Sequence, residues 1–187
     1  IGPEKLPAKF STGFIYWGVE RTGYDNVSYD GNFQFYWQWD QRVTREKSIA
    51  VSGVPDPSGK GVAASRPKGD DQGLYWFSTV NFAPPVNNLM QFYVLGGLVC
   101  KGLIPGRDKD RAGLALAYGD YSFDAASQDR ARGRDPRAYQ AVLEFDYRLQ
   151  VKRFLYVQPL IQYIMNPGGR GLVQNDTILG VHFGTNF

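Results

Sequence analysis

The sequence predicts an all-β fold, a transmembrane antiparallel β-barrel of about eight strands, on the basis of composition, hydropathy and periodicity. Aromatic residues form 15% of the 187 residues, yet the mean hydropathy of −0.37 is that of a water-soluble chain. Strands of a membrane barrel combine both properties because alternate residues face lipid and water. No segment approaches the ~18 consecutive apolar residues of a membrane-spanning helix. Segments with a period of two recur along the chain instead.

The first clear alternation covers residues 32–42. One parity carries Phe33, Phe35, Trp37 and Trp39, and the other carries Gln34, Gln38, Asp40 and Arg42. A period of two indicates a β-strand with two different faces. Large aromatic side chains on one whole face are unfavourable in water and favourable in lipid or at its interface. We therefore expect this strand to have one lipid-facing side and one wet side.

The same two-faced pattern continues along the chain and ends at turn residues in each copy. Further strands are predicted at about 9–19, 74–82, 91–101, 113–119, 139–150, 155–163 and 177–187. The segment 139–150 alternates most cleanly, with Phe145 on its apolar side and Glu144, Asp146 and Arg148 on its polar side. Polar segments 46–71 and 123–137 are predicted as long loops, the second with room for a helical turn. All 187 residues are expected to form one barrel region.

Several segments resemble one family. Gly97–Gly119 contains the turn Gly-Leu-Ile-Pro-Gly-Arg between two strands, and the last segment, Leu179–Phe187, ends on phenylalanine. These stretches, with Tyr139–Glu144 and Tyr156–Pro159, resemble the OprB family of carbohydrate-selective porins, most strongly over residues 72–187. The resemblance implies a sixteen-stranded sugar porin of the bacterial outer membrane. About eight strands are counted here, so the chain looks like the C-terminal half of such a barrel, although a self-contained eight-stranded barrel remains possible.

The chain also departs from the family pattern. The segment 46–71 is longer than the short connection expected there. Thr79 stands where an inward-facing arginine is common, which removes a pore-lining cation from that strand. Cys100 stands where an aromatic residue is frequent, on the parity expected to face lipid.

The function implied by the resemblance is passive diffusion of small neutral sugars such as glucose through a water-filled pore. Such a pore needs amides and charges that exchange hydrogen bonds with hydroxyl groups, and aromatic rings on which a sugar can rest. By parity, the pore-lining residues are Gln34, Gln38, Asp40, Arg42, Tyr75, Tyr93, Glu144, Asp146, Arg148, Gln158, Gln162 and His182. Of these, Asp40, Glu144, Arg148 and Gln158 are expected to matter most. The expected partners are sugars and outer-membrane lipid, and a homo-oligomer is left open.

Other functions receive little support. The net charge is only +3 and its charges are scattered, so nucleic-acid binding is not expected. His182 and Cys100 are each the only residue of their type, so no catalytic triad, metal site or cofactor is predicted. Glu144 and Asp146 share a face, as paired acids of a glycosidase would, but Arg148 follows them and favours a charge-compensated wall. The remaining alternatives are a soluble or secreted carbohydrate-binding β-sandwich and a small outer-membrane barrel that does not conduct.

Overall fold

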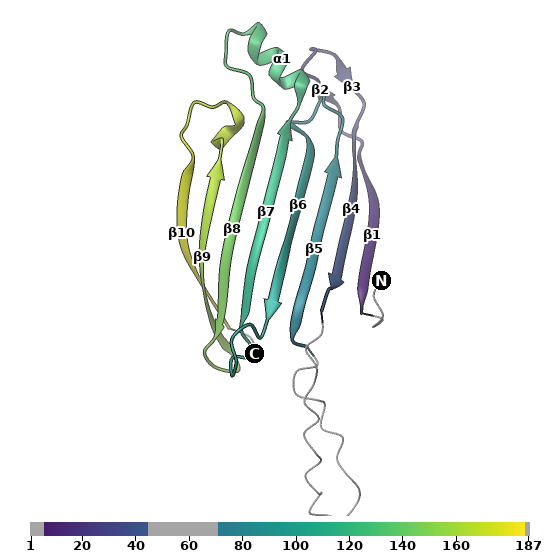
Figure 1. Ribbon diagram of the computed structural model, residues 1–187. Helices are drawn as coiled ribbons and strands as arrows, with labels where there is room; N and C mark the ends of the chain where they lie inside the picture. Colours follow the sequence, from purple (N-terminus) through teal and green to yellow (C-terminus); the bar gives the residue numbers. More distant parts are fainter. Residues whose placement is uncertain (1–5, 45–70, 186–187) are drawn as a thin grey trace, which may run out of the picture.

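The computed structural model describes residues 6–44 and 71–185. The long strands form one antiparallel sheet of eight strands in the order β1-β4-β5-β6-β7-β8-β9-β10, and β2 and β3 form a separate two-stranded hairpin (Figure 1). Each strand therefore pairs with the next long strand along the chain. Among the described residues, no helix has both the length and the apolar character needed to cross a membrane.

Ten strands, one α-helix and one 3₁₀ turn follow one another along the described chain. They are β1 (Ala8–Trp17), β2 (Arg21–Thr22), β3 (Ser28–Tyr29), β4 (Asn32–Arg42), β5 (Gly73–Phe82), β6 (Met90–Lys101), β7 (Arg111–Tyr121), α1 (Phe123–Ala131), β8 (Tyr139–Gln150), β9 (Leu155–Met165), the 3₁₀ turn η1 (Pro167–Gly169) and β10 (Asp176–Thr185). We call the end of the sheet next to α1 the helix end. The opposite end, with the connections 102–110 and 151–154, is the turn end (Figure 1).

The predicted all-β fold and its eight strands are confirmed, with small differences at the boundaries. The first strand ends at Trp17, two residues before the expected end at Val19. The predicted loop 123–137 begins with the nine-residue helix α1, which is longer than the single turn expected there. The other predicted long loop, 46–71, lies outside the described residues apart from Asp71.

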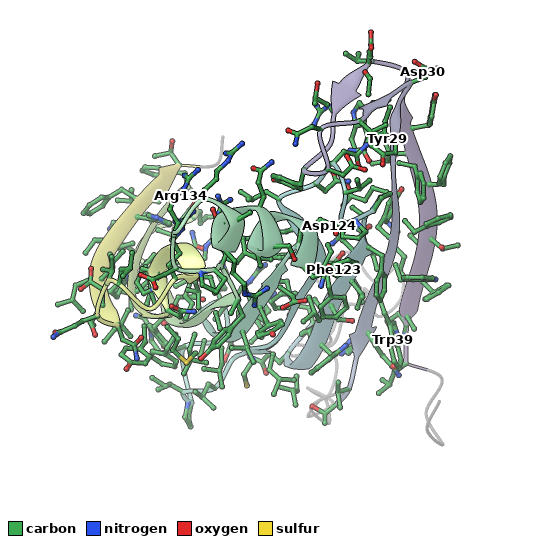
Figure 2. The ribbon with its side chains drawn as sticks, turned by 90° about the horizontal axis from the view of Figure 1, so that it is seen from above. Tyr29, Asp30, Trp39, Phe123, Asp124 and Arg134 are labelled. Atoms are coloured by element: carbon green, nitrogen blue, oxygen red, sulfur yellow. The ribbon has the colours of Figure 1, made fainter. Side chains whose placement is uncertain are left out.

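The sheet is a single curved layer. Seen from above, it is an open arc that runs from β10 to β1, with α1 on its concave side (Figure 2). A β-sandwich would need a second large sheet packed on the first. The only sheets in the described part of the chain are the eight-stranded sheet and the β2–β3 hairpin, which does not fit the β-sandwich alternative.

The convex face is apolar and exposed. Large side chains on it include Leu179, 77% exposed, Phe183, 74% exposed, and Phe10, 66% exposed. In the described residues, the buried apolar side chains are four alanines and one tyrosine, namely Ala112, Ala125, Ala126, Ala141 and Tyr121. A water-soluble domain buries its large apolar residues in a core. This sheet turns them outward, as a strand in contact with lipid does.

Aromatic residues form a continuous band on the convex face near the helix end. The ring centroids are 5.7 Å apart for Trp37 and Phe82, 4.9 Å for Phe82 and Phe92, 6.5 Å for Phe92 and Tyr118, and 5.7 Å for Tyr118 and Tyr139. These spacings are those of favourable aromatic contacts. The band crosses five neighbouring strands, β4 to β8. Aromatic girdles of this kind lie at the membrane interface of β-barrels.

Candidate functional site

The strand register places the predicted pore-lining residues on one face. Residues directly opposite each other in adjacent strands point to the same side of a sheet. Arg42 lies opposite Tyr75, which lies opposite Val99. Val99 lies opposite Gly113, which in turn lies opposite Asp146. The face that carries the polar residues of β4 thus continues across the sheet to β8.

The same rule extends the face to the last strands. Glu144 lies opposite Gln162 in β9, and Gln158 lies opposite His182 in β10. All twelve predicted residues therefore share the face opposite the aromatic band. They are Gln34, Gln38, Asp40, Arg42, Tyr75, Tyr93, Glu144, Asp146, Arg148, Gln158, Gln162 and His182. Because the aromatic band faces outward, this polar face is the inner, concave side of the arc (Figure 2).

Two acid–amide pairs join β8 and β9 on the concave face. Gln158 Nε2 donates a hydrogen bond to Asp146 Oδ1 at 2.8 Å, and Gln162 Nε2 donates to Glu144 Oε2. All four side chains are half-buried. Each carboxylate is partly satisfied by an amide, and the remaining carboxylate and amide oxygens can still accept hydrogen bonds. This arrangement offers an array of hydrogen-bond groups along the concave face.

Arg148 continues this polar strip toward the turn end. Its guanidinium carbon lies 3.5 Å from the centroid of the Tyr156 ring on β9. This is the geometry of a cation–π contact, which holds the planar guanidinium flat against the ring. Arg148 is half-buried, and the contact fixes its charge on the concave face.

The residues of β4 divide into an open group and a braced group. Gln38 and Asp40 are exposed, and Gln34 Nε2 donates a hydrogen bond to Asn81 Oδ1 of β5 at 2.9 Å. Arg42 is only 6% exposed and donates from Nε to the Thr44 carbonyl oxygen at 3.2 Å and from Nη2 to the Gln72 carbonyl oxygen. Arg42 shares the concave face, but its hydrogen bonds tie the ends of β4 and β5 together.

Small residues on β7 leave space on the concave face for side chains of the neighbouring strands. Gly113, Ala115, Ala117 and Gly119 occupy the inner parity of this strand. A Cβ atom at Gly113 would lie 2.2 Å from Asp146 Oδ2, and one at Gly97 on β6 would lie 2.6 Å from the Phe77 ring. The missing side chains allow Asp146 and Phe77 to lie across the neighbouring strands.

The helix α1 crosses the helix end of the concave face and is anchored on both sides (Figure 2). Ser122 caps it by accepting hydrogen bonds from the backbone N–H groups of Asp124 and Ala125. On one side, Gln128 Nε2 donates to the Tyr24 carbonyl oxygen at 3.0 Å. On the other, Arg170 Nη2 lies 2.8 Å from Asp129 Oδ1. The first anchor lies beside the β2–β3 hairpin and the second in the β9–β10 connection.

Asp129 is the centre of the second anchor. It is 2% exposed and forms ion pairs with Arg137 at 2.9 Å and with Arg170. Burial disfavours the ionised carboxylate, but the hydrogen bond and charge of Arg137, with the charges of Arg170 and Arg134, outweigh it and lower the pKa of Asp129 below 3.8. Sequence periodicity did not reveal this cluster. Only the Ser122 cap and Asp124 in the first turn hint at the helix.

The described residues contain no group of three or more histidine, cysteine or acidic side chains that could hold a metal ion. Cys100 is a free cysteine opposite Leu74 and Ala112, so it lies on the convex face as its parity predicts. The geometry provides hydrogen-bond donors, acceptors and ring faces along a concave wall, with an apolar outer surface.

These features define the class of protein: a segment of a membrane β-barrel with a polar inner wall. A sequence profile described as "Carbohydrate-selective porin, OprB family" matches residues 10–187. The chain therefore belongs to the OprB family of carbohydrate-selective porins, and the predicted outer-membrane location is confirmed with it.

A curated relative and a solved structure are similar to the chain. Porin B of Pseudomonas aeruginosa is 27% identical over 205 residues, which cover 100% of this chain and 43% of the relative. The structure titled "High pH structure of Pseudomonas putida OprB" matches with a TM-score of 0.81 and 20% identity, over 100% of this chain and 46% of the other. The chain thus spans less than half the length of either protein. The structural match supports the fold, a partial β-barrel.

Proposed function

We propose that this chain forms part of the wall of a water-filled pore through which small neutral sugars, such as glucose, diffuse passively across the outer membrane. The observation that carries the proposal is that polar residues of six strands, β4 to β6 and β8 to β10, share one face of the sheet, opposite an apolar face with an aromatic band. Lipid holds the convex face and water fills the concave side. No chemical step is required for such transport.

The concave wall has the chemistry that a sugar needs. A sugar that leaves bulk water must recover its hydrogen bonds from the wall. Asp40, Glu144 and Gln158 offer acceptors and, in the amide, donors as well. Half-buried Tyr75 and Tyr93 offer ring faces on which the apolar side of a pyranose can rest. A wall of mixed charge lets neutral solutes compete with ions.

The sheet needs further strands to close the pore. Within the described residues, β1 pairs with β4 alone and β10 pairs with β9 alone, so each has one unpaired edge. Each unpaired backbone group in hydrocarbon costs several kcal/mol, so open edges do not occur there. An eight-stranded barrel closed on itself would have its interior filled by side chains. We infer that strands beyond this sheet, from another segment or a second copy, cover both edges.

Single-channel conductance tests the proposal. The protein is extracted from outer membranes in detergent, inserted into planar bilayers and titrated with glucose. We expect stable channels whose current falls in a saturable way as glucose occupies the pore. A protein that retains its β-structure but conducts no ions, as a small plugged barrel would, contradicts the proposal. Cross-linking of the same sample shows whether second copies take part.

A further inference from the structure

Three basic residues lie side by side on the concave face at the turn end. Lys101 of β6 lies directly opposite Arg111 of β7, and Arg111 lies directly opposite Arg148 of β8. We call these three residues the cationic row. Directly opposite residues have Cβ atoms roughly 4.5–5.5 Å apart, and like charges at that spacing destabilise a sheet. An anion beside these two successive like-charge pairs would offset their repulsion.

The protein itself offsets only part of this charge. Lys101 forms an ion pair with Asp71, whose side chain is 70% exposed. Arg148 rests on the Tyr156 ring, which carries no charge. Among the described residues, no carboxylate forms an ion pair with the exposed Arg111.

Two acidic residues close in sequence to Arg111 and Arg148 interact with other groups. Asp110, next to Arg111, is 2% exposed and lies 2.6 Å from the Arg107 Nε. It also accepts hydrogen bonds from Tyr147 at 2.8 Å and from the backbone N–H of Gln150 at 2.9 Å. Asp146 accepts from Gln158. Among the described residues, neither carboxylate forms an ion pair with the cationic row, so the row together with Asp71 carries a net positive charge.

The cationic row borders a cavity. A hollow of about 450 Å³ is lined by Asp71, Tyr75, Val99, Lys101 and Arg111. This volume lies in the range of roughly 300–1,000 Å³ that is typical of small-molecule sites. Its lining combines two cations with the hydroxyl-bearing ring of Tyr75, so it can meet both a charged group and a ring face.

We propose that the cationic row and this cavity bind the oxyanion of an acidic sugar derivative. The oxyanion is a carboxylate or a phosphate, both of which the fork of an arginine matches with two parallel hydrogen bonds. Arg111 is the principal ligand, Lys101 adds a second charge, and Asp71 competes with the solute for Lys101. The inference rests on the proposed function, because the solute must first enter the pore.

The experiment uses gluconate, glucose 6-phosphate and glucose as probes of single-channel current in the same protein. We expect Arg111→Gln to weaken gluconate block about fivefold, the equivalent of an exposed ion pair, and to leave glucose block unchanged. Arg111→Lys retains the charge but loses the two parallel hydrogen bonds of the fork, so its gluconate block should lie between that of the unmodified protein and that of Arg111→Gln. Asp71→Asn releases Lys101 and should strengthen gluconate block, the opposite change.

Arg153 supplies the matched control. It is an exposed cation in the turn between β8 and β9, at the same end of the sheet but outside the strands. Arg153→Gln should leave block by all three solutes unchanged. The anion site is overturned if gluconate block weakens equally in Arg153→Gln and Arg111→Gln. It is also overturned if gluconate block is unchanged in Arg111→Gln. Absence of glucose block in the unmodified protein would instead contradict the proposed sugar pore. The ratio between the two anions assigns the ligand to carboxylate or phosphate.

Discussion

The convex and concave faces of the sheet consist of alternate residues of the same strands, and they are stabilised by different surroundings. On the convex side of β8, Phe145 is 49% exposed between Leu114 and Ile161, and it forms no polar contact. One residue away, Glu144 on the concave side accepts a hydrogen bond from Gln162. Neighbours in sequence thus meet lipid and water respectively. The effect of a substitution on assembly therefore depends more on the face of the sheet than on the position along the strand.

One polar residue on the convex face, Ser78, is satisfied by its neighbours. Ser78 lies on the apolar parity of β5, and its hydroxyl accepts a hydrogen bond from Trp76 Nε1 at 3.2 Å. The same hydroxyl donates to the Trp39 carbonyl oxygen at 3.4 Å. A hydroxyl without such partners would be costly in hydrocarbon. The two hydrogen bonds of Ser78 therefore remove that cost at this position.

The largest expected effect comes from a charge on the convex face. Phe145→Arg should destabilise the assembled protein by ~2–4 kcal/mol if the residue lies near the membrane midplane, because lipid cannot solvate the cation. Val181→Arg should act in the same way on β10. Heat-modifiable migration in gels and the yield of folded protein measure assembly.

The matched control for this charge is Gln162→Arg, which puts the same cation on the concave face opposite Glu144. It should assemble normally. An assembled and normally conducting Phe145→Arg variant would mean that the two faces have been assigned the wrong way round.

The next effect concerns α1, which crosses the helix end of the concave face. Because the pKa of Asp129 is lowered on folding, its ion pairs stabilise α1 above the ordinary pKa of 3.8 and lose that stabilisation as the pH falls through the lower folded value. We expect current noise to rise steeply below pH 3.8. Asp129→Asn should produce the same noise at neutral pH, since it removes the charge that Arg137 and Arg170 share.

The control for α1 is Asp124→Asn on the same helix. Asp124 lies in the first turn and takes no part in the ion pairs with Asp129. This variant should show no increase in current noise at neutral pH. Equal noise in both variants would show that the charge of the helix, and not the Asp129 cluster, holds α1 in place.

A smaller effect is expected on the concave face of β8. Glu144→Gln should keep the fold within about 0.5 kcal/mol, since a glutamine has the same shape and can still contact Gln162. Removing one wall charge should lower the permeability of cations relative to anions by about twofold. The reversal potential in a salt gradient measures this ratio. An unchanged reversal potential would place Glu144 away from the path of the ions.

The smallest effect is expected at Cys100. Its side chain faces the convex side between Leu74 and Ala112, so Cys100→Ala exchanges one small apolar group for another. Stability should change by less than about 1 kcal/mol, and conductance should not change. A thiol-reactive probe restricted to lipid should label the unmodified protein, whereas a charged, water-soluble probe should not.

Much of this fold is predictable from the sequence because alternation is local. Successive Cβ atoms of a strand point to opposite faces, so the side chains of Phe33 and Gln34 lie on opposite faces of the sheet whatever surrounds them. The eight strands and the common face of the twelve predicted residues follow from that geometry alone. That these residues line a pore remains a prediction. The sequence predicts only a helical turn where the nine-residue helix α1 lies, because this segment has little apolar periodicity. The anchors of α1, Tyr24 and Arg170, lie far away in the chain.

The sequence by itself determined which residues of each strand share its apolar face and which share its polar face. Only the tertiary structure decided which residues of different strands meet, because register depends on how strands far apart in the chain are paired. A shift of the pairing would part Glu144 from Gln162 and would separate Lys101, Arg111 and Arg148, which no local pattern brings together. The faces are a property of the strand, whereas the acid–amide pairs, the aromatic band and the cationic row are properties of the sheet.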